Sequence, residues 1–321
     1  MNLKVIGTVG DSKIATVHIA KTKENKYLEF VDSVQAPLLR KDKWVLIVSV
    51  LFGCPVGCLM CDAGNAFYGK LTKEEIFAQI DYLVNLRFPQ GVIDCKKFKI
   101  QFARMGEPTL NPALREVLGE LPARYKCPGL LPSFSTVAPD GCDGFLSELT
   151  AIKNRLYSNG KFQMQFSIHS TDQNLRDKII PVKKWDFTKI ADYCEKFYVT
   201  GDKKIALNFA LAKDAIICPD ELKKYFSPEI FIIKITPVNP TVHAVKNNIE
   251  SYFVSGASEE DSNNIVDKLQ DVGYEVIISM GNLEENKIGS NCGQYVRKFA
   301  MDKNIDLKGN AYCYVAETGF E

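Results

Sequence analysis

The 321-residue chain is 46% hydrophobic and carries 40 Lys plus Arg against 39 Asp plus Glu, a formal net charge of +1. A chain this close to neutral has no overall field that attracts polyanions, so charge argues against nucleic-acid binding unless folding gathers its scattered basic pairs into one patch. The longest apolar runs, 44–52 and 230–233, are strand-sized and too short to cross a bilayer, and no signal-peptide pattern opens the sequence. We therefore expect a cytoplasmic protein that does not engage the membrane. In that compartment the seven cysteines outside the segment 54–61 should stay reduced thiols.

The first forty residues alternate apolar and polar side chains in 13–20 and 27–31, a pattern that predicts a small antiparallel β element. From Trp44 onward, short β-rich runs are each followed by a helical stretch. The predicted strands are 45–52, 97–103, 131–136, 162–168, 205–211, 229–235 and 274–279. The predicted helices are 72–87, 186–199, 219–226 and 260–271, and the first of them begins with a capping box at Thr72.

Alternating β and α units predict a parallel sheet with right-handed crossovers. Six such units predict an α/β fold built on a partial (βα)6 TIM-type barrel, with its site at the carboxyl ends of the strands. We expect a β element over 1–40, the barrel core over 41–300 and a tail over 301–321.

Three cysteines follow the predicted strand 45–52 at CxxxCxxC spacing: Cys54, Cys58 and Cys61. Three thiolates can hold three irons of a [4Fe–4S] cluster and leave the fourth iron open. A structural zinc site usually has a second CxxC-type knuckle, which the sequence lacks. Zinc would need a remote ligand such as Cys95 or His169, and three incidental loop cysteines are the remaining alternative.

Five further segments follow this loop in order: "RMGEPTLNP" (104–112), "FSTVAP" (134–139), "FSIHSTDQNLRDKIIPVKKWD" (166–186), "ITPVNP" (235–240) and "NCGQYV" (291–296). Together with the loop they resemble the radical S-adenosylmethionine superfamily, and within it the RlmN/Cfr group of adenine-methylating enzymes. The resemblance runs from about residue 10 to 300, with Met60 in place of a residue that is often aromatic. It implies a [4Fe–4S] cluster bound by the three cysteines and S-adenosyl-L-methionine bound at the open iron.

The resemblance also implies a set of cofactor-binding residues. A carboxylate at a strand end suits the cofactor ammonium, hydroxyls and an imidazole suit its ribose and carboxylate, and an amide suits its adenine or ribose. These residues are Gly106 and Glu107, then Ser135, Ser167, Ile168 and His169, and finally Asn239.

Cys292 lies in a Gly-flanked segment and, by resemblance, is the catalytic cysteine that carries a methyl or methylene group to the acceptor. Two positions depart from the group. The second cysteine that releases the product is replaced by Ile47, and the glutamate that accepts a proton by Ala15. If another thiol took over the release step, Cys313 in the tail is the later cysteine that could do so.

We therefore expect a radical S-adenosylmethionine enzyme, a transferase of methyltransferase type, acting on an acceptor that the sequence does not name: a small molecule, a peptide or RNA. The alternatives are an adenine C-methyltransferase of ribosomal or transfer RNA, direct hydrogen abstraction without methyl transfer, and a non-catalytic iron–sulfur or zinc protein. An electron donor such as flavodoxin or ferredoxin is an expected partner.

Overall fold

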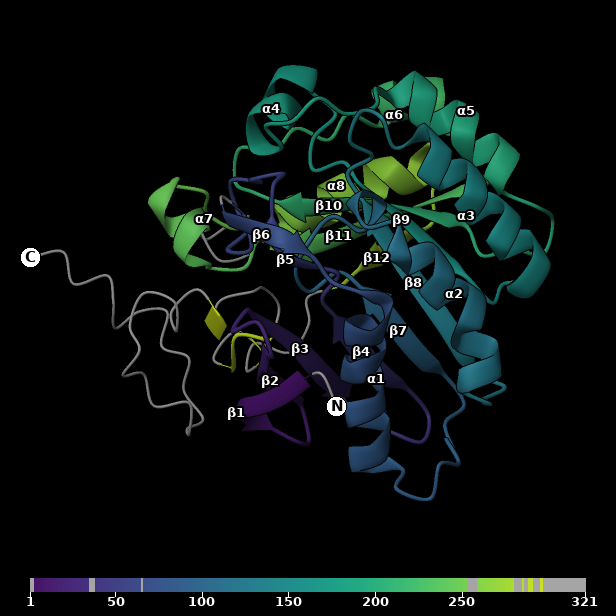
Figure 1. The fold of residues 1–321 in the computed structure, drawn as a ribbon. Coiled ribbons are helices and arrows are strands. Elements are labelled where there is room, and N and C mark those ends of the chain that lie inside the picture. The colour runs from purple at the N-terminus through teal and green to yellow at the C-terminus, as the bar shows by residue number, and fades with distance from the viewer. Residues whose placement is uncertain are drawn as a thin grey trace, which may run out of the picture. The chain divides into compact units, whose positions relative to one another are not determined.

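The computed structural model describes residues 3–34, 38–64, 66–252, 259–279, 285, 288–290 and 295–296, with only the backbone of 259–263. The chain divides into two compact units, drawn as a ribbon in Figure 1. The first comprises 1–57, 61–134 and 281–321, and the second comprises 58–60 and 135–280. Within the described residues, no helix is both long and apolar enough to cross a membrane.

The first unit begins with an antiparallel element, which confirms the predicted N-terminal β structure. Its strands pair in the order β1–β2–β3–β4–β7–β8, antiparallel as far as β4 and parallel from there on. They are β1 (Leu3–Asp11), β2 (Ala15–Thr22), β3 (Tyr27–Val34), β4 (Trp44–Val48), β7 (Phe98–Phe102) and β8 (Leu130–Thr136), whose last two residues belong to the second unit.

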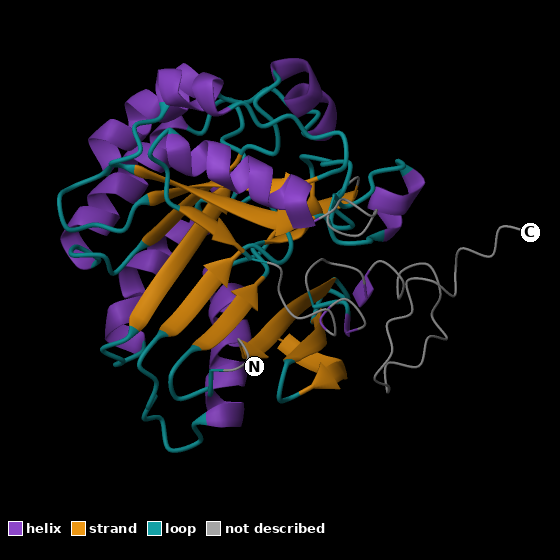
Figure 2. Cartoon of the chain, turned by 180° about the vertical axis from the view of Figure 1, so that it is seen from behind, coloured by secondary structure: helices purple, strands orange, loops and turns teal. Residues whose placement is uncertain are grey.

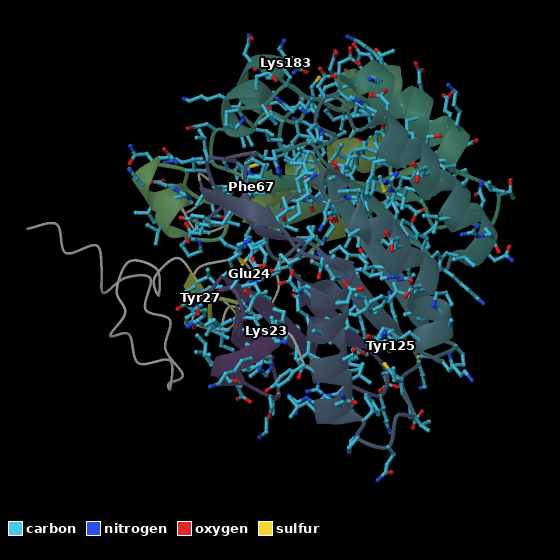
Figure 3. All side chains as sticks on the ribbon, in the orientation of Figure 1. Lys23, Glu24, Tyr27, Phe67, Tyr125 and Lys183 are labelled. Atoms are coloured by element: carbon cyan, nitrogen blue, oxygen red, sulfur yellow. The ribbon has the colours of Figure 1, made fainter. Side chains whose placement is uncertain are left out.

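Two helices of the first unit lie side by side, α1 (Lys73–Arg87) and α2 (Ala113–Arg124). The predicted capping box at the start of α1 is present: Thr72 Oγ1 accepts from Glu75 N at 3.1 Å, and Glu75 Oε2 accepts from Thr72 N at 2.9 Å. At the end of α2, the Tyr125 hydroxyl donates to Asp81 of α1 at 2.6 Å (Figure 3). This contact ties the end of α2 to the middle of α1.

The predicted strand 45–52 is interrupted, which corrects the sequence-based expectation. β4 ends at Val48, and the chain turns into a separate two-stranded sheet of β5 (Leu51–Cys54) and β6 (Ala66–Lys70). At the turn, Ser49 N donates to Gln79 Oε1 at 2.9 Å and Ser49 Oγ to Glu29 O at 2.6 Å. Ser49 thus bonds to the Gln79 side chain and to the Glu29 carbonyl of β3 instead of continuing the strand. The sequence does not reveal this break, because the strands on both sides of it are largely buried and apolar.

The second unit contains four parallel strands in the order β9–β10–β11–β12. They are β9 (Gln163–Ser167), β10 (Ile205–Leu211), β11 (Phe231–Pro237) and β12 (Val276–Ile278). Its helices are α3 (Asp143–Leu156), α4 (Gln173–Ile179), α5 (Phe187–Phe197), α6 (Pro219–Tyr225), α7 (Val242–Lys246) and α8 (Glu259–Asp271). Figures 1 and 2 show α3, α5 and α6 along one side of these strands.

Candidate functional site

The cysteine loop starts at Cys54, the last residue of β5, rather than directly after the barrel strand. Cys54 forms a β-bridge with Gly64, and Gly64 N donates to Cys61 O at 3.2 Å, so the loop closes on itself. Gly53 has a φ of 79°, and a Cβ there would lie 1.9 Å from Ala66 O. The close approach of β5 and β6 that supports the loop therefore requires glycine at this position.

Backbone N–H groups surround two of the three cysteines. Burial raises the pKa of the Cys54 thiol to about 12, and the nearby Cys61 adds to the effect, while amides of Val56 and Glu107 bond to its sulfur and oppose it. Burial also raises the pKa of Cys61, again opposed by two backbone amides, those of Ala63 and Gly64, and by the charge of Arg104. Amides placed in this way stabilise thiolates, the form in which cysteine binds iron, and iron displaces the thiol proton on binding.

Cys58 belongs to the second unit together with Leu59 and Met60. Leu59 N donates to Ile179 O at 3.0 Å, and Leu59 O accepts from Asn247 Nδ2 at 2.8 Å. Met60 O accepts from Thr241 Oγ1 at 2.8 Å, and the Met60 side chain packs against a buried apolar cluster. These contacts hold the backbone that directly follows Cys58.

Gly106 and Glu107 follow β7 in the first unit, as predicted for a strand-end site. Gly106 has a φ of 103°, and a Cβ there would lie 2.5 Å from the Leu51 side chain. The Glu107 carboxylate is 5% exposed and caps a short 3-10 turn, accepting from Thr109 N at 3.2 Å and from Thr109 Oγ1 at 2.8 Å. Its charge and its amide both act on Cys54. The structure thus brings Cys54, Cys61, Gly106 and Glu107 together.

The remaining predicted cofactor contacts lie in the second unit at the ends of β8, β9 and β11. The Ser135 hydroxyl is buried and has no hydrogen-bond partner among the described residues. A buried hydroxyl without a partner is costly unless a ligand supplies one, which fits a cofactor-binding role. Ser167 ends β9, whereas the Ile168 side chain is fully buried and its N–H donates to Asn208 O at 2.9 Å.

His169 is held in one orientation. Its φ is 65°, in the left-handed region, and its Nδ1 accepts from Ala210 N at 3.0 Å. Burial, together with the charge of Arg176, lowers the pKa of His169 to about 4. The ring is therefore neutral at pH 7 and carries its proton on Nε2, where it can donate to a carboxylate or hydroxyl oxygen.

Asn239 follows β11, and its carbonyl accepts from Thr241 N at 2.7 Å. Thr241 caps α7 and also holds Met60 O, so it connects the Asn239 turn to the backbone that carries Cys58. Within the second unit, Thr241 therefore links the turn that contains Asn239, a predicted cofactor contact, to the backbone next to Cys58, a predicted cluster ligand.

No three His, Cys, Asp or Glu side chains converge as ligands of a single metal ion in the described parts of the chain. Ligands of a cluster bind different irons and so need not converge on one point. Cys95, considered as a remote zinc ligand, bonds instead to the carbonyls of Arg40 at 3.1 Å and Lys97 at 3.2 Å.

The two departing positions lie in one apolar cluster of the first unit. Ala15 is 1% exposed and belongs to it, and Ile47 packs against it. Besides core residues of β2 and β3, the cluster contains Ile288 and Tyr295, which stand on either side of Cys292 in sequence. Cys292 itself, like Cys313, lies outside the described residues. Where the RlmN/Cfr pattern has a thiol and a carboxylate, this chain has a partly buried isoleucine and a buried alanine.

A buried ion pair that the sequence analysis missed joins the same region. Glu29 of β3 and Arg104, which follows β7, pair with no side-chain exposure on either partner. Arg104 also donates to Ser290 O and, at 2.9 Å, to Gly289 O, while Glu29 Oε2 accepts from Val296 N at 3.0 Å. The pair therefore binds the backbone on both sides of 291–294. The available signal was a lone acid at an apolar position of "YLEFV".

Known proteins give this arrangement a context, although no protein-family model matches the chain. The dual-specificity RNA methyltransferase RlmN of Aliarcobacter butzleri is 29% identical over 198 residues, 59% of this chain and 51% of that protein. RlmN of Nautilia profundicola is 26% identical over 214 residues, 65% and 58% of the two chains. The chain thus spans about half the length of these relatives.

The crystal structure of a radical SAM methyltransferase from Sphaerobacter thermophilus matches with a TM-score of 0.70 at 18% identity, over 92% of this chain and 81% of that one. The chain shares the fold of that radical SAM methyltransferase, which confirms the predicted partial barrel, and the relatives confirm the predicted resemblance to the radical S-adenosylmethionine superfamily. Within the superfamily the chain is a distant homologue of RlmN. The assignments of individual site residues and the domain boundaries stay predictions.

Proposed function

We propose that the chain is a radical S-adenosylmethionine enzyme that binds a [4Fe–4S] cluster through Cys54, Cys58 and Cys61. The observation that carries this proposal is the set of four backbone amides directed at Cys54 and Cys61, with the Glu107 carboxylate fixed beside them. Loop amides arranged in this way suit iron-bound thiolates.

When bound, such a cluster supplies the electron that splits S-adenosylmethionine into methionine and a 5′-deoxyadenosyl radical. With the cofactor bound, Glu107 would accept hydrogen bonds from its ammonium, a charge-assisted contact. His169 Nε2–H and the Ser135 and Ser167 hydroxyls would hold the cofactor carboxylate and ribose, and Asn239 would hold its adenine or ribose. The electron comes from a donor such as flavodoxin or ferredoxin.

In this proposal Cys292 carries a methyl or methylene group to an acceptor. Its thiolate would take the methyl group of a first cofactor molecule, with an S–CH₃ bond formed and S-adenosylhomocysteine released. The support is the order of the motifs and the anchoring of Gly289, Ser290 and Val296, which flank it, by the buried Glu29–Arg104 pair.

A second candidate is methylation of an RNA adenine, the activity in the names of the RlmN relatives. Sequence likeness favours it. The apolar surroundings of Ala15 and Ile47 weigh against it, because the described side chains of that cluster include neither a thiol to release the product nor a base to take its proton. Direct hydrogen abstraction without Cys292 is the third possibility.

The test uses protein purified anaerobically with its cluster. Cys54, Cys58 and Cys61 are together replaced by alanine, with exposed Cys218→Ala as the matched control. The triple variant should lose iron and cofactor cleavage together, and the control should keep both. Mass spectrometry should find the peptide with Cys292 heavier by about 14 Da, the mass of an added CH₂. Full turnover by Cys292→Ala would instead establish direct hydrogen abstraction.

A further inference from the structure

The two faces of the sheet in the second unit differ in character. Phe166 of β9 contacts Tyr193 of α5, and Phe231 of β11 contacts Phe226 beside α6, so this face packs on the helices. Side chains alternate along a strand, and parallel partners in register share a face. The opposite face therefore carries Gln165 and Ser167 of β9, Asn208 of β10, and Lys234 and Thr236 of β11.

Three of these polar residues form one row across neighbouring strands. Asn208 is in register with Ser167 on one side and with Lys234 on the other. Ser167 is a predicted cofactor contact at the end of its strand. The row thus reaches from the cofactor side of β9 to the lysine on β11.

Lys234 is a cation withdrawn from water without a counter-charge. Its Nζ donates to Gln165 Oε1 at 3.3 Å, a neutral acceptor, and no carboxylate in the described part of the chain forms an ion pair with it. Burial lowers its pKa, and no neighbouring acid raises it again. A partly buried ammonium without an anion is unfavourable, and an anionic ligand would remove that cost.

Asn208 has a side-chain oxygen that lacks a hydrogen-bond donor in the part of the chain that the structure describes. It is 7% exposed, and its Oδ1 is buried without a hydrogen-bond partner among the described residues. The Asn208 main-chain carbonyl is already used by Ile168 N and His169 N. The side-chain oxygen therefore lacks a donor, next to a lysine that lacks an anion.

Because the buried ammonium and the unpartnered amide oxygen lie on one face of the sheet, we propose that Asn208 and Lys234 bind the acceptor substrate, a small molecule with a carboxylate or phosphate for Lys234 and an N–H or O–H for Asn208. This inference rests on the proposed function, because it places the acceptor beside the predicted cofactor contact Ser167. A neutral adenine base by itself would leave the ammonium without a counter-charge, so Lys234 favours an acceptor that carries its own anionic group.

The test compares Lys234→Met, which keeps the length of the side chain, with Lys234→Arg, which keeps the charge. Exposed Lys223 on α6 provides the control Lys223→Met. Inorganic phosphate and succinate, a dicarboxylate, are titrated separately into the cluster-containing protein at pH 7, so the two arms distinguish the anion types. Affinity is read calorimetrically and by protection of Lys234 from acetic anhydride labelling.

At least one anion should bind wild type and the Lys223→Met control alike and protect Lys234. Loss of a charged hydrogen bond should weaken binding by about 10- to 100-fold in Lys234→Met, with partial recovery in Lys234→Arg. Equal binding by Lys234→Met, or an equal loss of S-adenosylmethionine binding, would overturn the proposal, the second by assigning Lys234 to the cofactor. Anion binding that depends on Lys234 in a protein without cofactor cleavage would uphold the anion site and refute the proposed function instead.

Discussion

Replacing Glu29 by glutamine removes the negative partner of Arg104 while keeping the shape of the side chain. Neither side chain has any exposure, so solvent does not screen the remaining guanidinium. Breaking a buried pair from one side costs about 3–5 kcal/mol, because a charge is left uncompensated. Glu29→Gln should therefore lose about that much stability in urea unfolding, and Arg104→Met should lose at least as much, since it also abandons the carbonyls of Gly289 and Ser290.

The double variant Glu29→Gln/Arg104→Met separates a paired interaction from two independent ones. Removing both charges leaves no buried ion, so its loss should be clearly smaller than the sum of the single losses. The surface pair Asp42–Lys96 is the control, and Asp42→Asn should leave the urea unfolding midpoint nearly unchanged, because solvent screens that pair.

Amide hydrogen exchange measures the local effect of these variants alongside their unfolding free energies. Because the pair binds Gly289, Ser290 and Val296, both single variants should speed amide hydrogen exchange in the peptide that spans 288–296. Single losses below 1 kcal/mol that add up in the double variant, with unchanged exchange, would refute the reasoning.

Three further predictions concern single side chains. Burial holds the pKa of both His18 and His169 at about 4, below the unfolded value of 6.5, so the unfolded chain binds more protons than the folded one between these pH values. The free energy of unfolding should therefore fall as pH drops from about 6.5 to 4, by up to roughly 3 kcal/mol per histidine. Urea unfolding across that pH range checks this, and a flat profile would contradict it. Gly106→Ala should lower the free energy of unfolding by more than about 2 kcal/mol and reduce iron content, because its Cβ would lie 2.5 Å from Leu51 at a φ of 103°. The control Gly144→Ala in α3, where a Cβ would have nothing within 4 Å, should be neutral or slightly stabilising. Equal effects of the two substitutions would show that Gly106 is not constrained. Glu107→Gln should weaken S-adenosylmethionine binding by about 10- to 100-fold with iron content unchanged, and unaltered affinity in a calorimetric titration would remove Glu107 from the site.

Sequence periodicity and local chemistry predicted the elements that depend on neighbours in the chain. The capping box at Thr72 is one, and the parallel strands from 97–103 to 229–235 are another. The division of 45–52 into β4 and β5 was not predictable, because it depends on Gln79 and Met105, distant partners that bond to the turn at Ser49 and Val50.

The same limit applies to the site. The motif order led to Cys54, Cys61, Gly106 and Glu107, which the first unit brings together. Glu29 and Arg104 escaped notice because they are 75 positions apart and become a pair only when β3 and the segment after β7 fold together. Lys234 reads in sequence as one polar residue in a strand, and only the register with Asn208 shows what surrounds it.

The apolar cluster around Ala15 and Ile47 has an evolutionary consequence. A glutamate introduced alone at position 15 would enter a site that is 1% exposed, among Val17, Val31 and Ile288, with its charge unpaired. Such a change costs several kcal/mol, a large part of what a domain has to lose. A glutamate at position 15 is therefore tolerated only if neighbouring core positions change with it. A single substitution is a poor route to the polar pattern, because the intermediate sequence would fold badly.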